Sequence, residues 1–179
     1  MEPSTAILAA GVVPAAKERD PAPPRPGFDA ALGRALGPGA TLVPAQRTAL
    51  GGEDAKTALK HAWKERFGAS PSRETLALLV AQWAHETGRG ASMYNFNFGG
   101  IKGAGPSGLS VAQRTREDSG RAERVIVDRF RAYQTADEGA ADYLDLLARR
   151  FPVALNAAEE GDAAGFVRGL KAKGYFTGD

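Results

Sequence analysis

The chain has 179 residues, with 23 lysines and arginines against 21 aspartates and glutamates and a formal net charge of +2. This balance, without any block of basic residues, argues against a nucleic-acid-binding surface. The absence of cysteine excludes disulfides, thiolate metal ligands and a thiol nucleophile.

Residues 1–50 are rich in alanine, proline and glycine, a composition typical of a flexible arm. The apolar run at 6–13 follows a glutamate in place of basic residues and is too short to span a bilayer. We therefore expect neither a secretion signal nor a membrane span. For residues 28–36 the alternatives are an inert linker and a short helix that docks onto an envelope or secretion-machine partner.

Two helices are expected at the start of the folded region, which we place at residues 51–179. The first covers 55–66, with Asp54 as its N-cap and Gly68 after its end. Its inward face carries four residues: Ala58, Leu59, Ala62 and Trp63.

The second helix carries a run of apolar residues and continues into Glu86. Either Ser70 or Ser72 caps it, and Pro71 suits its first turn. The glycines that follow Glu86 end it.

The remaining pattern adds one β-hairpin and two helices. After a glycine-rich loop over 91–109, the loosely alternating segments 110–117 and 124–132 predict a β-hairpin. Helices are expected at 136–150 and 162–173, each with an apolar face. The fold class is therefore α+β, mainly helical with a small β-hairpin lobe.

One carboxylate stands out as a candidate general acid. Leu79, Trp83 and Glu86 share one helix face, so Glu86 is partly desolvated and lies at the negative end of the helix dipole. Both influences raise its pKa, which suits a proton donor near neutral pH; the alternative is an ordinary glutamate near a helix end. His61 and His85 have no further ligands at a metal-binding spacing, so no metal or other cofactor is expected. The sequence also contains no nucleophile elbow, so a Ser-His-Asp triad is not expected either.

From this glutamate onward, the chain carries a series of motifs in a characteristic order. They are Glu-Thr-Gly-Arg-Gly at 86–90, Tyr-Asn at 94–95, Phe-Gly-Gly-Ile-Lys-Gly at 98–103, Phe-Arg-Ala-Tyr at 130–133, Asp-Tyr-Leu at 142–144 and Gly-Tyr-Phe-Thr at 174–177. Together they resemble the glucosaminidase domain of glycoside hydrolase family 73, which includes flagellar-type muramidases and autolysins. The likeness covers about residues 72–179 and implies a lysozyme-like fold.

The resemblance implies a peptidoglycan hydrolase that cleaves the β-1,4 bond between N-acetylglucosamine and N-acetylmuramic acid, with Glu86 as general acid. Its substrate would be peptidoglycan glycan strands, and its location the periplasm, the cell wall or the outside of the cell. Two alternatives remain: a muramidase or lytic transglycosylase of the same fold, and a non-catalytic glycan-binding module of an envelope or secretion machine.

A second carboxylate is expected on the hairpin. The hairpin offers four candidates: Glu117, Asp118, Glu123 and Asp128. When the resemblance is anchored on Phe-Arg-Ala-Tyr, Glu117 takes the family's second acidic position, whereas anchoring on residues 119–120 puts Arg116 there. The alternative is assistance by the substrate's own 2-acetamido group, with Glu117 a solvated turn residue.

Five residues are candidates for substrate binding: Tyr94, Asn95, Gly100, Lys102 and Tyr133. The resemblance implies that Tyr94 and Asn95 contact or orient the substrate beside the acid. Gly100 lets the backbone approach a ligand closely. Lys102 meets a peptide-stem carboxylate or is solvated, and Tyr133 packs beneath the hairpin or contacts sugar.

The chain departs from the family's pattern in three places. Arg89 stands where the family usually has tryptophan, and the glycine loop after Tyr-Asn is longer. The chain stops at Asp179, where the family commonly continues into a closing helix with a tyrosine. We expect either a truncated piece or a domain that does without this helix.

Overall fold

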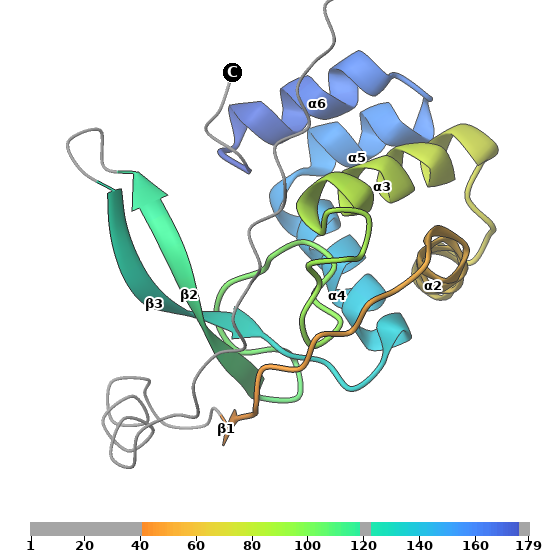
Figure 1. Cartoon of the computed structure of the whole chain (residues 1–179). Coiled ribbons are helices and arrows are strands. Elements are labelled where there is room, and N and C mark those ends of the chain that lie inside the picture. The colour runs from red at the N-terminus through yellow and green to blue at the C-terminus, as the bar shows by residue number, and fades with distance from the viewer. Residues whose placement is uncertain (1–40, 119–122, 176–179) are drawn as a thin grey trace, which may run out of the picture. The chain divides into compact units, whose positions relative to one another are not determined.

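The computed structural model describes residues 41–118 and 123–175, and of 114–118 and 123–126 it describes the backbone. A helical body carries a small sheet (Figure 1), which confirms the α+β class with a hairpin lobe. Within the described ranges no helix is long and apolar enough to cross a membrane. In chain order the elements are β1 (Thr41–Leu42), α2 (Gly52–Phe67), α3 (Arg73–Glu86), β2 (Leu109–Asp118), β3 (Glu123–Arg131), α4 (Ala136–Arg150), α5 (Pro152–Glu159) and α6 (Ala163–Ala172).

The sheet consists mainly of the β2–β3 hairpin. These strands pair antiparallel, from Ser110 opposite Arg131 to Asp118 opposite Glu123, which confirms the predicted hairpin. β1 adds a short parallel edge beside the start of β2. The two long strands project from the helical body as a separate lobe (Figure 1).

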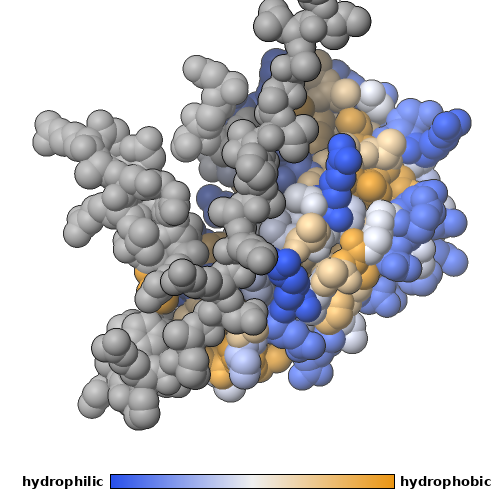
Figure 2. Space-filling view, viewed as in Figure 1, coloured by the Kyte–Doolittle hydropathy of each residue, from blue (hydrophilic) through white to orange (hydrophobic). Residues whose placement is uncertain are grey.

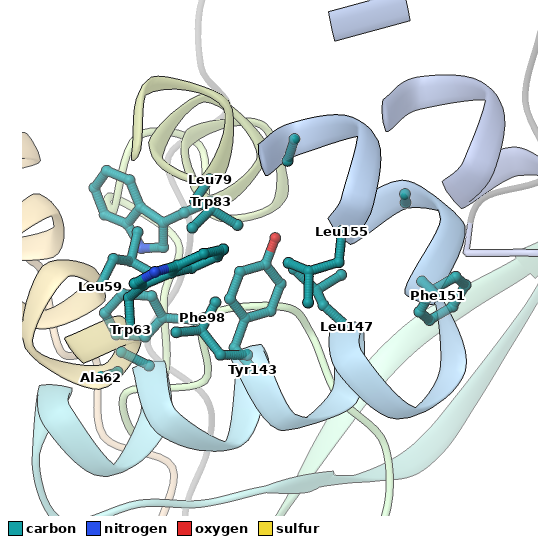
Figure 3. Close-up of a cluster of buried hydrophobic side chains, with 14 of the residues drawn as sticks. Leu59, Ala62, Trp63, Leu79, Trp83, Phe98, Tyr143, Leu147, Phe151 and Leu155 are labelled. Atoms are coloured by element: carbon teal, nitrogen blue, oxygen red, sulfur yellow. The ribbon is translucent and has the colours of Figure 1, made fainter. Parts of the chain in front are cut away.

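A hydrophobic core lies between α2, α3, α4 and α5 (Figure 3). Burial of such apolar surface is the main driving force for folding. All four residues predicted on the inner face of α2 belong to it. Hydrophilic residues are interspersed with hydrophobic ones on the face seen in Figure 2. The core residues labelled in Figure 3 are Leu59, Ala62, Trp63, Leu79, Trp83, Phe98, Tyr143, Leu147, Phe151 and Leu155.

The helix caps agree only partly with the sequence prediction. Ser72 caps α3, because its hydroxyl accepts the amide of the third helical residue at 3.0 Å. Pro71 therefore precedes the cap, and its placement in the first turn is wrong. The prediction of Asp54 as a cap is also wrong: Gly51 takes that position, and Asp54 lies in the first turn of α2, where its charge complements the helix dipole.

Helix α5 follows α4 directly and was not predicted. Phe151 separates the two helices with φ −128° and ψ 46°, and Pro152 starts α5 without an amide to donate. α5 and α6 then pack at close range. A methyl group on Gly169 of α6 would lie 2.7 Å from the backbone of Ala154 in α5, so glycine is required at this crossing.

Residues 41–50, which the sequence analysis assigned to the arm, are part of the folded unit, and we call this segment the strap. The Val43 amide donates to the Ser110 carbonyl at 2.8 Å, and the Thr48 amide to the Met93 carbonyl at 3.0 Å. The strap runs from β1 to α2 (Figure 1, orange). The rest of the predicted arm, with its candidate helix at 28–36, lies outside the described residues.

Candidate active site

Glu86 is the last residue of α3, and the chain turns sharply after it. The Thr87 hydroxyl donates to the Trp83 carbonyl at 2.7 Å and accepts the Gly90 amide at 2.9 Å. Residues 88–90 all have positive φ, a region that glycine enters without steric cost. The Glu-Thr-Gly-Arg-Gly motif therefore ends α3 and leaves Glu86 at its C-terminal end, as predicted.

The proton affinity of Glu86 is set by opposing influences. Burial raises its pKa above the usual 4.5, while the neighbouring His85 and a hydrogen bond from Gln82 lower it. The net direction is upward, as the sequence analysis predicted. Gln82 Nε2 donates to Glu86 Oε1 at 2.7 Å, and Gln82 is 8% exposed. Sequence reasoning missed Gln82, although its position four residues before Glu86 on the same helix was a signal.

Two tyrosines lie close enough to Glu86 for its charge to affect them. Burial raises the pKa of Tyr143 on α4, and the neighbouring Tyr175 and Glu86 raise it further. Burial also raises the pKa of Tyr175, again with a contribution from Glu86. Both phenols therefore stay protonated near neutral pH. The Tyr143 hydroxyl is buried without a hydrogen-bond partner and points away from α4 (Figure 3).

The glycine loop packs against these two phenols. A methyl group on Gly99 would lie 2.8 Å from both the Tyr143 ring and the Tyr175 hydroxyl oxygen, so the close approach requires glycine. The Tyr175 hydroxyl donates to the Gly99 carbonyl at 3.3 Å. Gly100 is exposed with φ +57° and has open space around its α-carbon. Its backbone is accessible, and the close approach of a ligand to it stays a prediction.

A buried asparagine that the sequence analysis did not single out closes this loop. The Asn97 amide donates to the carbonyls of Ile101 and Arg131, at 3.0 Å each, and accepts the Ile101 amide at 2.8 Å. The glycine loop is thereby joined to the end of β3.

The two residues of the predicted substrate-binding pair, Tyr94 and Asn95, make different contacts with the strap. Tyr94 is half-buried, with the Arg47 guanidinium 5.7 Å from its ring centroid. Asn95 is 8% exposed, and its side chain accepts the Gln46 amide and donates to the Pro44 carbonyl, each at 3.1 Å. The Asn95 side-chain amide therefore holds the strap, and its contact with sugar stays a prediction.

Lys102 is exposed on the loop but is paired with the hairpin. Its Nζ lies 2.5 Å from Asp128 Oδ2 on β3, and this contact lowers the pKa of Asp128. Lys102 therefore connects the loop to β3, and Asp128, one of the four acidic candidates of the hairpin, is engaged by it.

Tyr133 lies in the interior of the domain. It is 5% exposed, and its hydroxyl donates to Asp142 Oδ2 at 2.5 Å. Arg131 Nη1 donates to both oxygens of Asp142, at 2.7 and 2.9 Å. These contacts agree with packing beneath the hairpin, and a sugar contact by Tyr133 stays a prediction.

Glu117 lies on β2, in register with Arg124 of β3. Its side chain, like those of Arg116, Asp118 and Glu123, is outside the described part of the structure. The role of Glu117 stays a prediction.

Two hollows lined by described residues lie away from the acid. One is lined by α5 and α6, and the other mainly by α2 and α4; Glu86 lines neither. In the described ranges, no three histidine, aspartate or glutamate side chains come together as a metal site.

Comparison with known proteins places this site in a family. The family model described as mannosyl-glycoprotein endo-beta-N-acetylglucosaminidase matches residues 73–179, more than half of the chain. The chain belongs to this glucosaminidase family. It is therefore a glycoside hydrolase, and the family predicted from the motifs is confirmed.

Several solved structures are similar to this glucosaminidase. A peptidoglycan hydrolase mutant from Sphingomonas sp. A1 is 31% identical, covers 70% of this chain and 77% of its own, and has a TM-score of 0.49. A C-terminally truncated glycoside hydrolase domain of Salmonella typhimurium FlgJ is 24% identical, with coverages of 67% and 86% and a TM-score of 0.45. The catalytic domain of the Listeria monocytogenes autolysin Auto is 17% identical, with coverages of 85% and 97% and a TM-score of 0.48. A search of curated proteins found no significant match.

The glucosaminidase match begins at the start of α3 and includes Glu86, the glycine loop and the hairpin. The strap and α2 precede it. Contacts between the strap and the loop therefore join a segment outside the family match to one inside it.

Proposed function

We propose that this glycoside hydrolase cleaves the β-1,4 bond between N-acetylglucosamine and N-acetylmuramic acid in peptidoglycan, with Glu86 as general acid. The observation that carries the proposal is a half-buried carboxyl group with a raised pKa at the end of α3, within the family match. The Sphingomonas relative, named as a peptidoglycan hydrolase, supports this choice of substrate. Action in the periplasm, in the cell wall or outside the cell follows from that substrate.

The proposed chemistry transfers one proton from Glu86. Its carboxyl group protonates the glycosidic oxygen as the bond to the anomeric carbon breaks, and positive charge develops on the sugar ring. The resulting carboxylate keeps the hydrogen bond from Gln82 Nε2, which stabilises the anion. The nearby Tyr143 and Tyr175 stay neutral and add no competing negative charge.

The positive charge on the sugar needs a stabilising group on the other face of the ring. We assign this role to Glu117 on the hairpin, with the substrate's 2-acetamido group as the alternative. Tyr94 and the accessible backbone of Gly100 are proposed to contact the sugar chain, because both lie on the loop that packs beside the acid's neighbours.

Digestion of purified sacculi, followed by mass spectrometry of the released fragments, tests the activity and the bond together. We expect fragments that end in reducing N-acetylglucosamine. Reducing N-acetylmuramic acid would indicate a muramidase, and anhydro ends a lytic transglycosylase. Binding of the protein to sacculi without release of fragments would favour the alternative of a non-catalytic glycan-binding module.

The role of Glu86 is tested by Glu86→Gln, with Glu74→Gln on the exposed face of α3 as a matched control. We expect Glu86→Gln to abolish fragment release while wall binding persists, because the amide cannot donate the required proton. The control should retain full activity. Release that survives Glu86→Gln would refute the acid assignment.

A pH–rate profile of Glu117→Gln tests the second group. We expect turnover to fall by at least about tenfold, with the loss of one ionisation from the acidic limb. Unchanged turnover would move the role to the substrate's acetamido group or to Asp118.

A further inference from the structure

The strap makes an unusually dense set of contacts with the loop that carries Tyr94. In the strap, the Gln46 carbonyl accepts the Asn95 amide at 2.8 Å, and the Gln46 amide donates to Asn95 Oδ1 at 3.1 Å. Asn95 Nδ2 reaches the Pro44 carbonyl at 3.1 Å, and Arg47 lies over the Tyr94 ring. Contacts therefore extend along the strap and are not confined to one point.

Thr48 is the central residue of this contact. Its amide donates to the Met93 carbonyl at 3.0 Å, and its hydroxyl accepts the Phe96 amide at 2.8 Å. Thr48 is 8% exposed, so water does not readily replace these bonds. One residue of the strap thereby binds the loop on both sides of Tyr94 and Asn95.

The loop needs such an external restraint because its backbone is strained. Asn95 and Phe96 have φ of +46° and +51°, a region that costs non-glycine residues about 1–3 kcal/mol. The cost is higher for Phe96, because asparagine enters this region more readily than phenylalanine. Two consecutive residues of this kind persist only where their surroundings over-determine the conformation.

The rest of the domain holds the loop from other directions. The Asn95 carbonyl accepts the Tyr133 amide at 3.0 Å, and the Phe96 carbonyl packs directly against Gly139 of α4. The Phe98 ring packs on Trp83, one turn before the acid on α3, with centroids 6.2 Å apart. The loop is thus fixed between the acid's helix and the strap.

We propose that Thr48 is a positioning residue: through the Phe96 amide it fixes the left-handed turn that orients Tyr94 toward the substrate. This inference rests on the proposed function, since it assigns Tyr94 to substrate binding. It also makes the strap, which precedes the family match, a component of the active site.

Thr48→Val tests the proposal, because valine keeps the side-chain shape and removes the acceptor; Thr48→Ser keeps the acceptor and is the matched control. Amide hydrogen exchange at Phe96 should be at least about tenfold faster in Thr48→Val than in the wild type or in Thr48→Ser. On soluble glycan fragments, KM should rise roughly tenfold in Thr48→Val, with kcat changed less than about twofold. A merely structural effect would instead lower kcat through loss of folded enzyme and leave KM unchanged.

Phe96→Gly in the Thr48→Val background provides a rescue, because glycine adopts the turn without strain. We expect KM to return at least halfway to the wild-type value. Should Thr48→Val fail to fold, Thr48→Ala serves in its place, since alanine also lacks the acceptor for the Phe96 amide. A KM raised by at least about threefold is then expected.

The outcomes separate this inference from the proposed function. An active wild type whose Thr48→Val variant shows unchanged exchange at Phe96, or unchanged KM, overturns the positioning role alone. A wild type that releases no fragments from sacculi overturns the proposed function and the positioning role together, whatever the exchange rates.

Discussion

Burial and a few neighbouring side chains set the pKa of Glu86. Burial disfavours the carboxylate, whereas the Gln82 amide donates to it and favours the charged form. A general acid must hold its proton until the substrate binds and must then be stable as an anion. In the proposed role of Glu86, the opposing influences on its pKa would serve both requirements.

Gln82→Leu should raise the pKa of Glu86, because the hydrogen bond that favours the anion is lost while burial persists. The alkaline limb of the pH–rate profile should then move to higher pH, and maximal kcat should fall about tenfold through loss of a charge-assisted bond. Kinetics on sacculi fragments between pH 4 and 9 measure both effects. Gln134→Leu, an exposed glutamine before α4, is the control and should change neither. An alkaline limb that stays in place would show that Gln82 does not tune the acid.

Glu86 should also make stability depend on pH. Because its folded-state pKa lies above the unfolded value of 4.5, its protonation favours the folded state fully below pH 4.5, and this contribution is lost as pH rises through the folded pKa. Glu86→Gln should therefore raise the midpoint of thermal unfolding at pH 7 and leave it almost unchanged at pH 4. A variant less stable than the wild type at pH 7 would contradict this account.

The position of Glu86 was predictable because helical periodicity and glycine stops are local in sequence. The role of Asn95 was not, since its partners Pro44 and Gln46 lie about fifty residues earlier. Its residue type suited both a sugar contact and a backbone bond. Only the three-dimensional path of the strap shows that the backbone bonds form.

Between elements, one buried cluster connects β3 to α4. Arg131 and Tyr133, at and after the end of the strand, both donate to Asp142 on the helix. Asp142 is 8% exposed, whereas the Arg131 side chain is 29% exposed, so solvent weakens this pair somewhat. The cluster fixes the base of the hairpin against the helical body.

Asp142→Ala should lower the free energy of unfolding by about 2–3 kcal/mol, because it leaves the Tyr133 hydroxyl and the Arg131 charge without their acceptor. Asp145→Ala is the matched control, because it removes the same type of side chain about one turn further along α4. Asp145 pairs with Arg66 and Arg149 at the surface, and its loss should cost less than about 1 kcal/mol. Urea unfolding measures both, and equal losses would contradict the proposed importance of burial.

The elements differ in how far their sequences define them. α4 was predicted to the residue, at 136–150, because its apolar face is continuous and Thr135 caps it. α5 was missed because it has eight residues and no polar N-cap, and because only Phe151 separates Pro152 from the end of α4. Such a short helix is stabilised by packing against α6, which its own sequence does not show.

At the scale of the whole molecule, the folded unit is longer than the family match. The match begins at residue 73, yet α2 contributes to the core and the strap binds the Tyr94 loop. The predicted boundary near residue 50 therefore falls after the strap, which has backbone bonds to β2 and to the loop. Composition alone could not locate it, because the strap still contains alanine and proline.

Truncation separates the strap from the rest of the predicted arm. A chain that starts at residue 41 should retain activity on sacculi within about twofold. A chain that starts at residue 51 should lose most of it, because the strained loop loses its restraint. Fragment release and thermal unfolding of the two chains provide the measurement. Equal activity of both would show that the strap is dispensable.

The packing of α5 against α6 affects the surroundings of Glu86, although neither helix contacts that carboxyl group through the crossing itself. Gly169 lies against Ala154, and the residues after α6 bring Tyr175 to the Gly99 carbonyl beside Glu86. A single methyl group added at Gly169 would push α6 outward and draw this phenol away. Water would then enter beside the carboxyl group and weaken its hold on the proton. If Glu86 is the proposed acid, activity therefore depends on the size of the side chain at position 169, on a helix crossing remote from that carboxyl group.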